Sequence, residues 1–131
     1  MRAPTGAWLR AGISRDGGPF TEPDHVVWLQ VGELYADSRG FAGSTTYDGA
    51  RVRWLHEVGT PGDDSGALEP DGNGLLERGD GYLERWVPLP GEVSPVGAWT
   101  GGGARVVRVG DYVVHVRPDG TGVHLTGGVQ A

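Results

Sequence analysis

Short valine-rich runs separated by glycine-containing turn pairs are the feature of this sequence that most constrains its fold. Turn pairs such as Gly32-Glu33, Asp48-Gly49, Asp80-Gly81 and Gly110-Asp111 punctuate the chain at short intervals. Asp-Gly and Asn-Gly pairs supply the positive φ angles that tight hairpins need. A helix of three turns would need an apolar period of about 3.6 residues without Gly or Pro, and no window of the sequence has one. The sequence therefore predicts an all-β protein.

The runs between the turns predict ten strands, which we expect to form a closed antiparallel meander barrel of 8–10 strands. Nearly every link has hairpin length, so consecutive strands are expected to pair antiparallel. Closure into a barrel would remove the two unpaired edges, and a sandwich is the alternative. The length of 131 residues predicts a single domain, 1–131. The predicted strands are Gly6–Ser14, His25–Val31, Leu34–Arg39, Ala50–Val58, Ala67–Glu69, Leu75–Arg78, Tyr82–Leu89, Ala104–Val109, Tyr112–Arg117 and Gly122–Leu125.

Composition and charge exclude several classes of function. A net charge of −6 argues against a nucleic-acid partner, whose phosphates call for a basic surface. The chain has no Cys and no Lys, so we expect no thiolate metal site, no thiol nucleophile and no Schiff-base chemistry. No apolar run approaches the ~18 residues of a membrane span, and the Arg-containing first residues do not resemble a signal peptide. We therefore expect a cytoplasmic protein with no membrane partner; the sequence leaves the oligomeric state open.

Three predicted strands share one pattern, a polar residue two positions from a tryptophan. Side chains alternate across a strand, so both members of each pair lie on one face, which we expect to point inward. Aromatic walls with a few polar groups are typical of a ligand cavity, whereas unpaired buried polar groups are costly. An internal hydrogen-bond network is the alternative, as is the opposite phase with Glu84 outside. The pairs are Trp28 with Gln30, Trp54 with His56, and Trp86 with Glu84.

Two further sets of residues are candidates for the same pocket. Tyr82 shares a face with Glu84 and Trp86, so it is predicted to line the cavity as well. Asp37 and Arg39 share one face of their strand, either as a surface ion pair or as a charged clamp at the mouth of the barrel. With a single inward histidine and no paired His spacing, no metal site is predicted. The acidic stretch Gly59–Gly66 lacks the ligand pattern of a calcium loop and is predicted to be a solvated turn.

Several short motifs resemble those of known barrels. Gly6-Ala7-Trp8 is similar to the Gly-x-Trp opening of lipocalin-like (calycin) barrels, in which the tryptophan plugs one end. The haem-binding barrels of that superfamily continue with further glycines, whereas Leu9-Arg10-Ala11 follows here, so no cofactor is expected. A longer string resembles a group of small, uncharacterised bacterial proteins associated with lipocalin-like barrels, and it implies the fold, a pocket and Glu77 as one of its residues. The string is Trp28-Leu29-Gln30, Tyr35-x-Asp37-x-Arg39, Phe41-Ala42-Gly43, Trp54-x-His56, Glu77-x-Gly79 and Tyr82-x-Glu84-x-Trp86.

These observations leave three classes of function open. The first is a binding protein that holds a small apolar or aromatic molecule in a tryptophan-lined central pocket. The second is a cofactor-independent enzyme, an isomerase, hydratase or cyclase of secondary metabolism, in which His56 and Glu84 form an acid–base pair. The third is a structural or partner-binding module without a ligand. The candidate ligand-binding residues are Trp28, Gln30, Asp37, Arg39, Trp54, Glu77, Tyr82 and Trp86.

Overall fold

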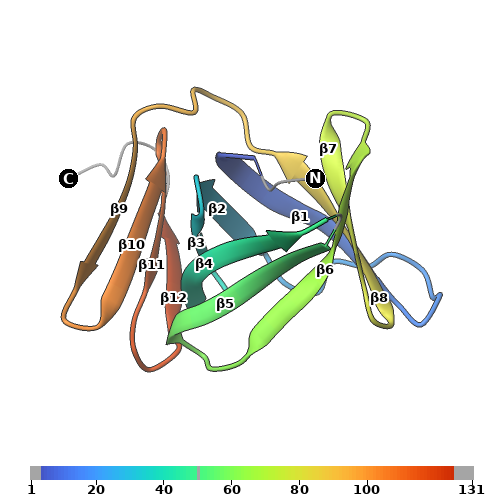
Figure 1. Cartoon of the computed structure of the whole chain (residues 1–131). Coiled ribbons are helices and arrows are strands. Elements are labelled where there is room, and N and C mark those ends of the chain that lie inside the picture. The colour runs from blue at the N-terminus through green and yellow to red at the C-terminus, as the bar shows by residue number, and fades with distance from the viewer. Residues whose placement is uncertain (1–3, 50, 126–131) are drawn as a thin grey trace.

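The computed structural model describes residues 4–49 and 51–125, and every regular element in these ranges is a β-strand (Figure 1). The prediction of an all-β protein is confirmed. Ala50, with which one predicted strand begins, lies outside the described residues. The strands are β1 (Gly6–Arg15), β2 (Val27–Val31), β3 (Leu34–Asp37), β4 (Phe41–Asp48), β5 (Arg51–Gly59), β6 (Asp63–Asp71), β7 (Gly74–Gly79), β8 (Tyr82–Pro88), β9 (Val96–Gly101), β10 (Ala104–Val109), β11 (Tyr112–Val116) and β12 (Gly122–Leu125).

Strands β1 to β8 form a closed antiparallel barrel in which each strand pairs with the next along the chain. The barrel closes where β1 pairs with β8, as in the register of Ile13 opposite Glu84. The predicted closed meander of 8–10 strands is confirmed. Turn glycines have the positive φ angles that the turn pairs predicted, for example Gly32 at 58° and Gly81 at 77°.

The last four strands form a separate sheet, in the order β12-β11-β10-β9, rather than continuing the barrel (Figure 1). The prediction that all strands belong to one meander is wrong on this point. The barrel is already closed by β8, and Pro88, Pro90 and Pro95 around the β8–β9 link cannot donate ladder hydrogen bonds. The separate sheet lies against the outer face of β2 and β3. That residues 1–131 make a single domain stays a prediction.

Two strands escaped prediction and a third is longer than predicted. Strand β4, with its run Gly43-Ser44-Thr45-Thr46, carries few large apolar side chains, and β9 lies in a glycine-rich stretch between two predicted strands. Strand β6 begins at Asp63, so the second half of Gly59–Gly66 is paired with β5 and is not a solvated turn. In all three cases the pairing partner, rather than local propensity, determines the strand.

Strand β2 is buried on both faces and joins the two layers. Trp28 and Gln30 point into the barrel, whereas Val27 and Leu29 pack against the separate sheet. The unbroken run of large side chains in this strand is what burial on both faces requires, since a half-exposed strand would alternate with polar residues.

β-Bulges set which side chains of β1 and β5 point inward. The register of β1 shifts between Arg10 and Gly12, so that Arg10 and Ile13 are both buried. The register of β4 against β5 shifts between Ala42 and Gly43, and Val58 consequently packs toward the separate sheet. Simple alternation from the predicted inward pair Trp54 and His56 would place Val58 inside the barrel as well, and this expectation is wrong because an inserted residue reverses the phase of a strand.

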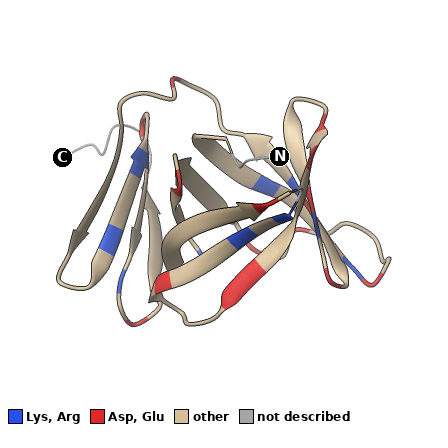
Figure 2. Cartoon of the chain, viewed as in Figure 1, with Lys and Arg blue, Asp and Glu red and all other residues tan. Residues whose placement is uncertain are grey.

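Residues of both charge signs are distributed over the strands of the barrel (Figure 2). On β5 and β6, Arg53 donates to Asp63 (2.6 Å), and on β6 and β7, Arg78 donates to Glu69 (3.0 Å). All four side chains are at least 44% exposed. Such exposed pairs contribute little to the free energy of unfolding, so the stability of the barrel does not depend on them.

Candidate functional site

One part of the barrel interior is filled by side chains that bond to one another. The rings of Trp8 and Trp28 stack with centroids 6.1 Å apart. The indole N–H of Trp28 donates to the Gln30 amide oxygen (3.0 Å), and the Gln30 amide nitrogen donates to the Gly32 carbonyl (2.8 Å) and to Thr45 Oγ1 (3.2 Å). Gln30 is fully buried and does not line the cavity described next. An internal network and a cavity, which the sequence left open as alternatives, therefore exist side by side.

The remaining interior encloses a cavity of about 220 Å³ with aromatic walls. Trp28 makes edge contacts with Trp54 (5.8 Å between centroids) and with Trp86 (5.3 Å), so the three tryptophans of the sequence pattern meet in one cluster. The aromatic lining consists of Trp28, Tyr35, Phe41, Trp54, Tyr82 and Trp86. Its ionisable groups are Arg15, Asp37, Arg39, Asp64, Glu77 and Glu84.

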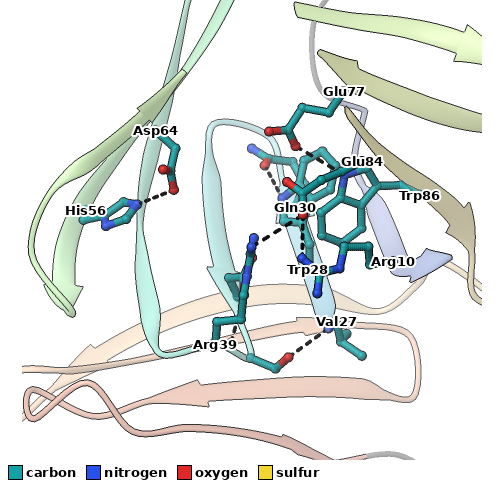
Figure 3. Close-up of polar contacts among 12 residues, drawn as sticks. Arg10, Val27, Trp28, Gln30, Arg39, His56, Asp64, Glu77, Glu84 and Trp86 are labelled. Atoms are coloured by element: carbon teal, nitrogen blue, oxygen red, sulfur yellow. Dashed lines mark hydrogen bonds and ion pairs between the residues drawn. The ribbon is translucent and has the colours of Figure 1, made fainter. Parts of the chain in front are cut away.

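A chain of ion pairs runs through the barrel wall to the cavity (Figure 3). Arg10 donates to Glu22 (2.8 and 3.2 Å) and to Glu84 (2.8 Å). Glu84 also lies 3.5 Å from a guanidinium nitrogen of Arg39. Arg39 in turn donates hydrogen bonds to both carboxylate oxygens of Asp37 (3.0 and 2.8 Å). The side chains of Arg10, Glu84 and Asp37 are at most 4% exposed. The Asp37–Arg39 pair is thus a component of the cavity wall.

This chain contains more carboxylates than guanidiniums. Three carboxylates, those of Glu22, Asp37 and Glu84, face the two guanidiniums of Arg10 and Arg39. Burial alone would lower the pKa of Arg39, but Asp37 and Glu84 outweigh burial and raise it. The same competition, with Glu22 and Glu84 as partners, raises the pKa of Arg10. Both arginines are therefore fixed cations that match the two buried carboxylates, Asp37 and Glu84, and the third carboxylate, Glu22, lies at the exposed end of the chain.

Glu77 is a buried carboxyl group of the cavity that is bonded to neutral donors. The Tyr82 hydroxyl donates to one of its oxygens (2.6 Å) and the Trp86 indole N–H to the other (3.2 Å). Glu77 pairs directly with Glu84 in the β7–β8 register. Burial, and then the negative charge of Glu84, raises the pKa of Glu77 to about 8. Glu77 consequently holds its proton at neutral pH, and the pKa of Tyr82 is raised by burial and by Glu77.

His56 is held away from Glu84, its predicted partner. Its ring stacks on Phe41 (centroids 4.1 Å apart), one ring nitrogen lies 3.0 Å from Asp64 Oδ2, and the other lies 3.0 Å from the Thr60 carbonyl. His56 is not part of the cavity lining, whereas Asp64 and Phe41 are. Figure 3 shows the His56–Asp64 pair separated from Glu84, with Arg39 between them in this view. The structure therefore does not bring His56 and Glu84 together.

Eight of the ten predicted site residues lie in the cavity lining, and two, Gln30 and His56, do not. The eight are Trp28, Asp37, Arg39, Trp54, Glu77, Tyr82, Trp86 and, from the proposed acid–base pair, Glu84. Sequence reasoning missed Arg10, Tyr35 and Phe41. Tyr35 shares a face with Asp37, and Arg10 shares a face with Trp8, so both signals were available in the sequence; Phe41 lies on a strand that was not predicted.

The architecture and the site together define a closed eight-stranded antiparallel barrel with a polar and aromatic interior. This architecture is consistent with a lipocalin-like fold, as the sequence motifs implied, and Trp8 lies inside the barrel. Comparisons with protein-family models, with curated proteins and with solved structures find no match to the chain.

Two further findings apply to the part of the chain that the structure describes. Within residues 4–49 and 51–125, no helix has the length and apolar character to cross a membrane. In the same ranges, no group of three or more His, Cys, Asp or Glu side chains is arranged to hold a metal ion.

Proposed function

We propose that the barrel is a binding protein whose cavity takes up a small organic molecule with an aromatic or apolar body. The observation that carries this proposal is the cavity of about 220 Å³ walled by six aromatic side chains inside a closed barrel. An engineered protein cavity of about 150 Å³ holds benzene, so this one is large enough for a substituted single ring. Membership of the lipocalin-like (calycin) superfamily, many of whose barrels have an internal pocket, is part of the proposal.

The polar groups of the wall suit a ligand that has one polar end. Trp54 and Trp86 offer apolar faces, while Glu77 and Glu84 lie together where β7 pairs with β8. A few polar groups among apolar walls fix the orientation of a ligand and reject molecules that cannot satisfy them. We therefore expect the ring to contact the tryptophans and the polar end to reach the glutamates.

Binding of a small fluorinated probe tests the proposal. We expect 4-fluorobenzyl alcohol to bind saturably, as measured by ¹⁹F NMR line broadening, and Trp54→Ala to weaken binding by about tenfold, which corresponds to about 1.4 kcal/mol. Trp99→Ala is the matched control, because Trp99 is 56% exposed on β9 in the separate sheet and should leave binding unchanged. Absence of saturable binding for neutral, cationic and anionic probes alike would show that the cavity is not a ligand site.

A second candidate is acid–base catalysis without a cofactor in the same cavity. The observation that favours it is the pairing of Glu77, which holds a proton, with Glu84, which accepts hydrogen bonds from arginine. One group can donate a proton and the other can accept one. Mass spectrometry of molecules that co-purify with the protein would supply the substrate. Glu77→Gln and Glu84→Gln should then slow its conversion by about 10²–10⁴-fold, and unchanged rates would exclude this candidate.

A further inference from the structure

We infer that the ligand of the cavity is an organic cation: a substituted ammonium group on an aromatic or apolar body, held by aromatic ring faces and the carboxylate of Glu77. This inference rests on the proposed function and specifies the class of ligand. Three independent features of the cavity support it: the balance of charge, the aromatic walls and the bonding of Glu77.

The balance of charge favours a cation over an anion. The cavity lining contains the carboxyl groups of Asp37, Glu77 and Glu84 against the guanidiniums of Arg15 and Arg39. The guanidiniums of Arg10 and Arg39 are engaged by these carboxylates, so neither is available to an anionic ligand without breaking an ion pair. Asp64 adds a further acidic group to the lining. The lining therefore has four carboxyl groups and two guanidiniums, and a bound ammonium group would reduce this excess of acidic groups.

The aromatic walls suit a cation as well as they suit an apolar body. A cation over the face of an aromatic ring is attracted by the ring quadrupole, most strongly for tryptophan, and cages of such rings bind substituted ammonium groups. The cavity already shows this preference, because the guanidinium of Arg39 lies over the Phe41 ring, 5.2 Å from its centroid. Trp54, Tyr82 and Trp86 remain available on the cavity wall.

Glu77 is the carboxyl group with which a bound cation would form an ion pair. It is 5% exposed, and its bonded partners are the neutral donors of Tyr82 and Trp86 rather than a guanidinium. A neutral carboxyl group gains nothing from an ammonium group, whereas a carboxylate pairs with it strongly. Binding of a cation would therefore expel the proton of Glu77 to solvent.

This coupling predicts a pH dependence with a definite sign. Below its pKa of about 8 Glu77 is protonated, so a cation must displace the proton and binds more weakly; above that pH the carboxylate is already formed. Affinity for a permanent cation should therefore rise with pH and level off above pH 8 to 9. The other titratable groups around the cavity are Tyr82 and Glu84 on β8, Asp64 on β6 with its partner His56 on β5, Asp37 and Tyr35 on β3 with the following Arg39, Arg10 and Arg15 on β1, and Glu22 beside Arg10.

Three probes of one shape and different charge test the inference. They are (4-fluorobenzyl)trimethylammonium, its neutral carbon isostere 1-fluoro-4-(2,2-dimethylpropyl)benzene, and the anion (4-fluorophenyl)methanesulfonate. We expect the cation to bind at least about tenfold more tightly than the neutral isostere at pH 9, and the anion to bind most weakly. Dissociation constants would be measured by ¹⁹F NMR on the full-length protein.

The role of Glu77 has its own test. For the cation, affinity should rise roughly tenfold or more from pH 6 to pH 9, and Glu77→Gln should flatten this profile. Glu69→Gln is the matched control, because it removes the same charge from an exposed position on β6 and should leave the profile intact. The profile of the unmodified protein provides the answer even if Glu77→Gln does not fold.

The possible outcomes distinguish a failure of this inference from a failure of the proposed binding function. If the neutral or anionic probe binds as tightly as the cation, the cationic ligand class is wrong and the proposed binding function stands. If the cation is preferred but its affinity does not change with pH, the assignment to Glu77 is overturned. If none of the three probes binds, both the inference and the proposed function fail.

Discussion

The protein has two cores of opposite character, separated by a single layer of strands. The buried residues of the core between the barrel and the separate sheet are all aliphatic, whereas the core inside the barrel combines tryptophans with buried acids and an arginine. Strand β2 contributes to both, with Val27 and Leu29 on one face and Trp28 and Gln30 on the other. The buried residues of the aliphatic core are Ala7, Val27, Leu29, Ala36, Ala42, Val107, Val109, Val114 and Val116.

The difference between the cores indicates a division of labour. Aliphatic side chains that fill space without polar atoms stabilise a fold at no electrostatic cost. A chain of buried ion pairs is, by contrast, a poor way to stabilise a protein, because removing charges from water costs several kcal/mol per ion. We therefore propose that the aliphatic core supplies most of the stability of the fold and that the barrel interior serves ligand binding. The predictions below test this division.

The largest expected effect is a pH-dependent loss of stability caused by Glu77. Its pKa in the folded protein, about 8, lies above the usual value of 4.5, so between these values the unfolded chain releases a proton that the folded protein keeps. Raising the pH from 5 to 8 should therefore lower the free energy of unfolding by roughly 3–5 kcal/mol through this group alone. Glu77→Gln should remove that share of the decline, as measured by urea unfolding at pH 5, 6.5 and 8.

The control for this experiment is Glu69→Gln, since Glu69 is half-exposed and paired with Arg78 on the outer surface. It should retain the decline of the original protein. If the stability of Glu77→Gln falls with pH as steeply as that of the original protein, Glu77 is not the buried proton carrier that we describe.

The next largest effect is expected in the aliphatic core. Leu29→Ala removes a fully buried side chain between β2 and the separate sheet and should lower the free energy of unfolding by about 2–5 kcal/mol. The dissociation constant of a cavity probe should change less than twofold in the fraction that remains folded. A large change in probe affinity would mean that the two cores are not independent, and the division of labour would fail.

The smallest effect is expected on the outer surface of the barrel. Arg53→Ala breaks the exposed pair with Asp63 and should change the free energy of unfolding by no more than about 0.5 kcal/mol. Thermal unfolding and probe binding of this variant should match those of the original protein. A loss above about 1 kcal/mol would show that surface charge contributes to stability as much as a core side chain does.

The fold was predictable as far as local patterns carry it. Turn glycines and short strands indicated a meander barrel, and alternation placed Trp28, Trp54, Trp86 and Glu84 on inward faces, as the structure has them. The separate sheet was not predictable in this way. No local sequence pattern shows that β8 pairs with β1 and closes the barrel, so that the later strands pair among themselves. Strand β2 has large side chains, mostly apolar, on both of its faces, and this was a sign in the sequence that a second layer covers it.

The site was predictable in its aromatic part and less so in its electrostatic part. Alternation cannot show a bulge, and the bulge in β1 is what makes Arg10 and Ile13 both buried. The sequence also does not show that Asp64 and Phe41 hold His56, because these contacts join three strands. The raised pKa of Glu77 depends on the register that sets it opposite Glu84, and register is a property of the assembled sheet.

The central claim is that the cavity lining carries more carboxyl groups than guanidiniums and that one of them, Glu77, keeps its proton, and the ionisation of Glu77 tests it most directly. A ¹³C NMR pH titration of the glutamate side-chain carboxyl groups, with the Glu77 signal assigned from Glu77→Gln, would measure its pKa in the folded protein. We predict a midpoint near the value of about 8, and a downward shift in Glu84→Gln, which removes the neighbouring negative charge. A midpoint near the usual 4.5, unchanged by Glu84→Gln, would contradict the account.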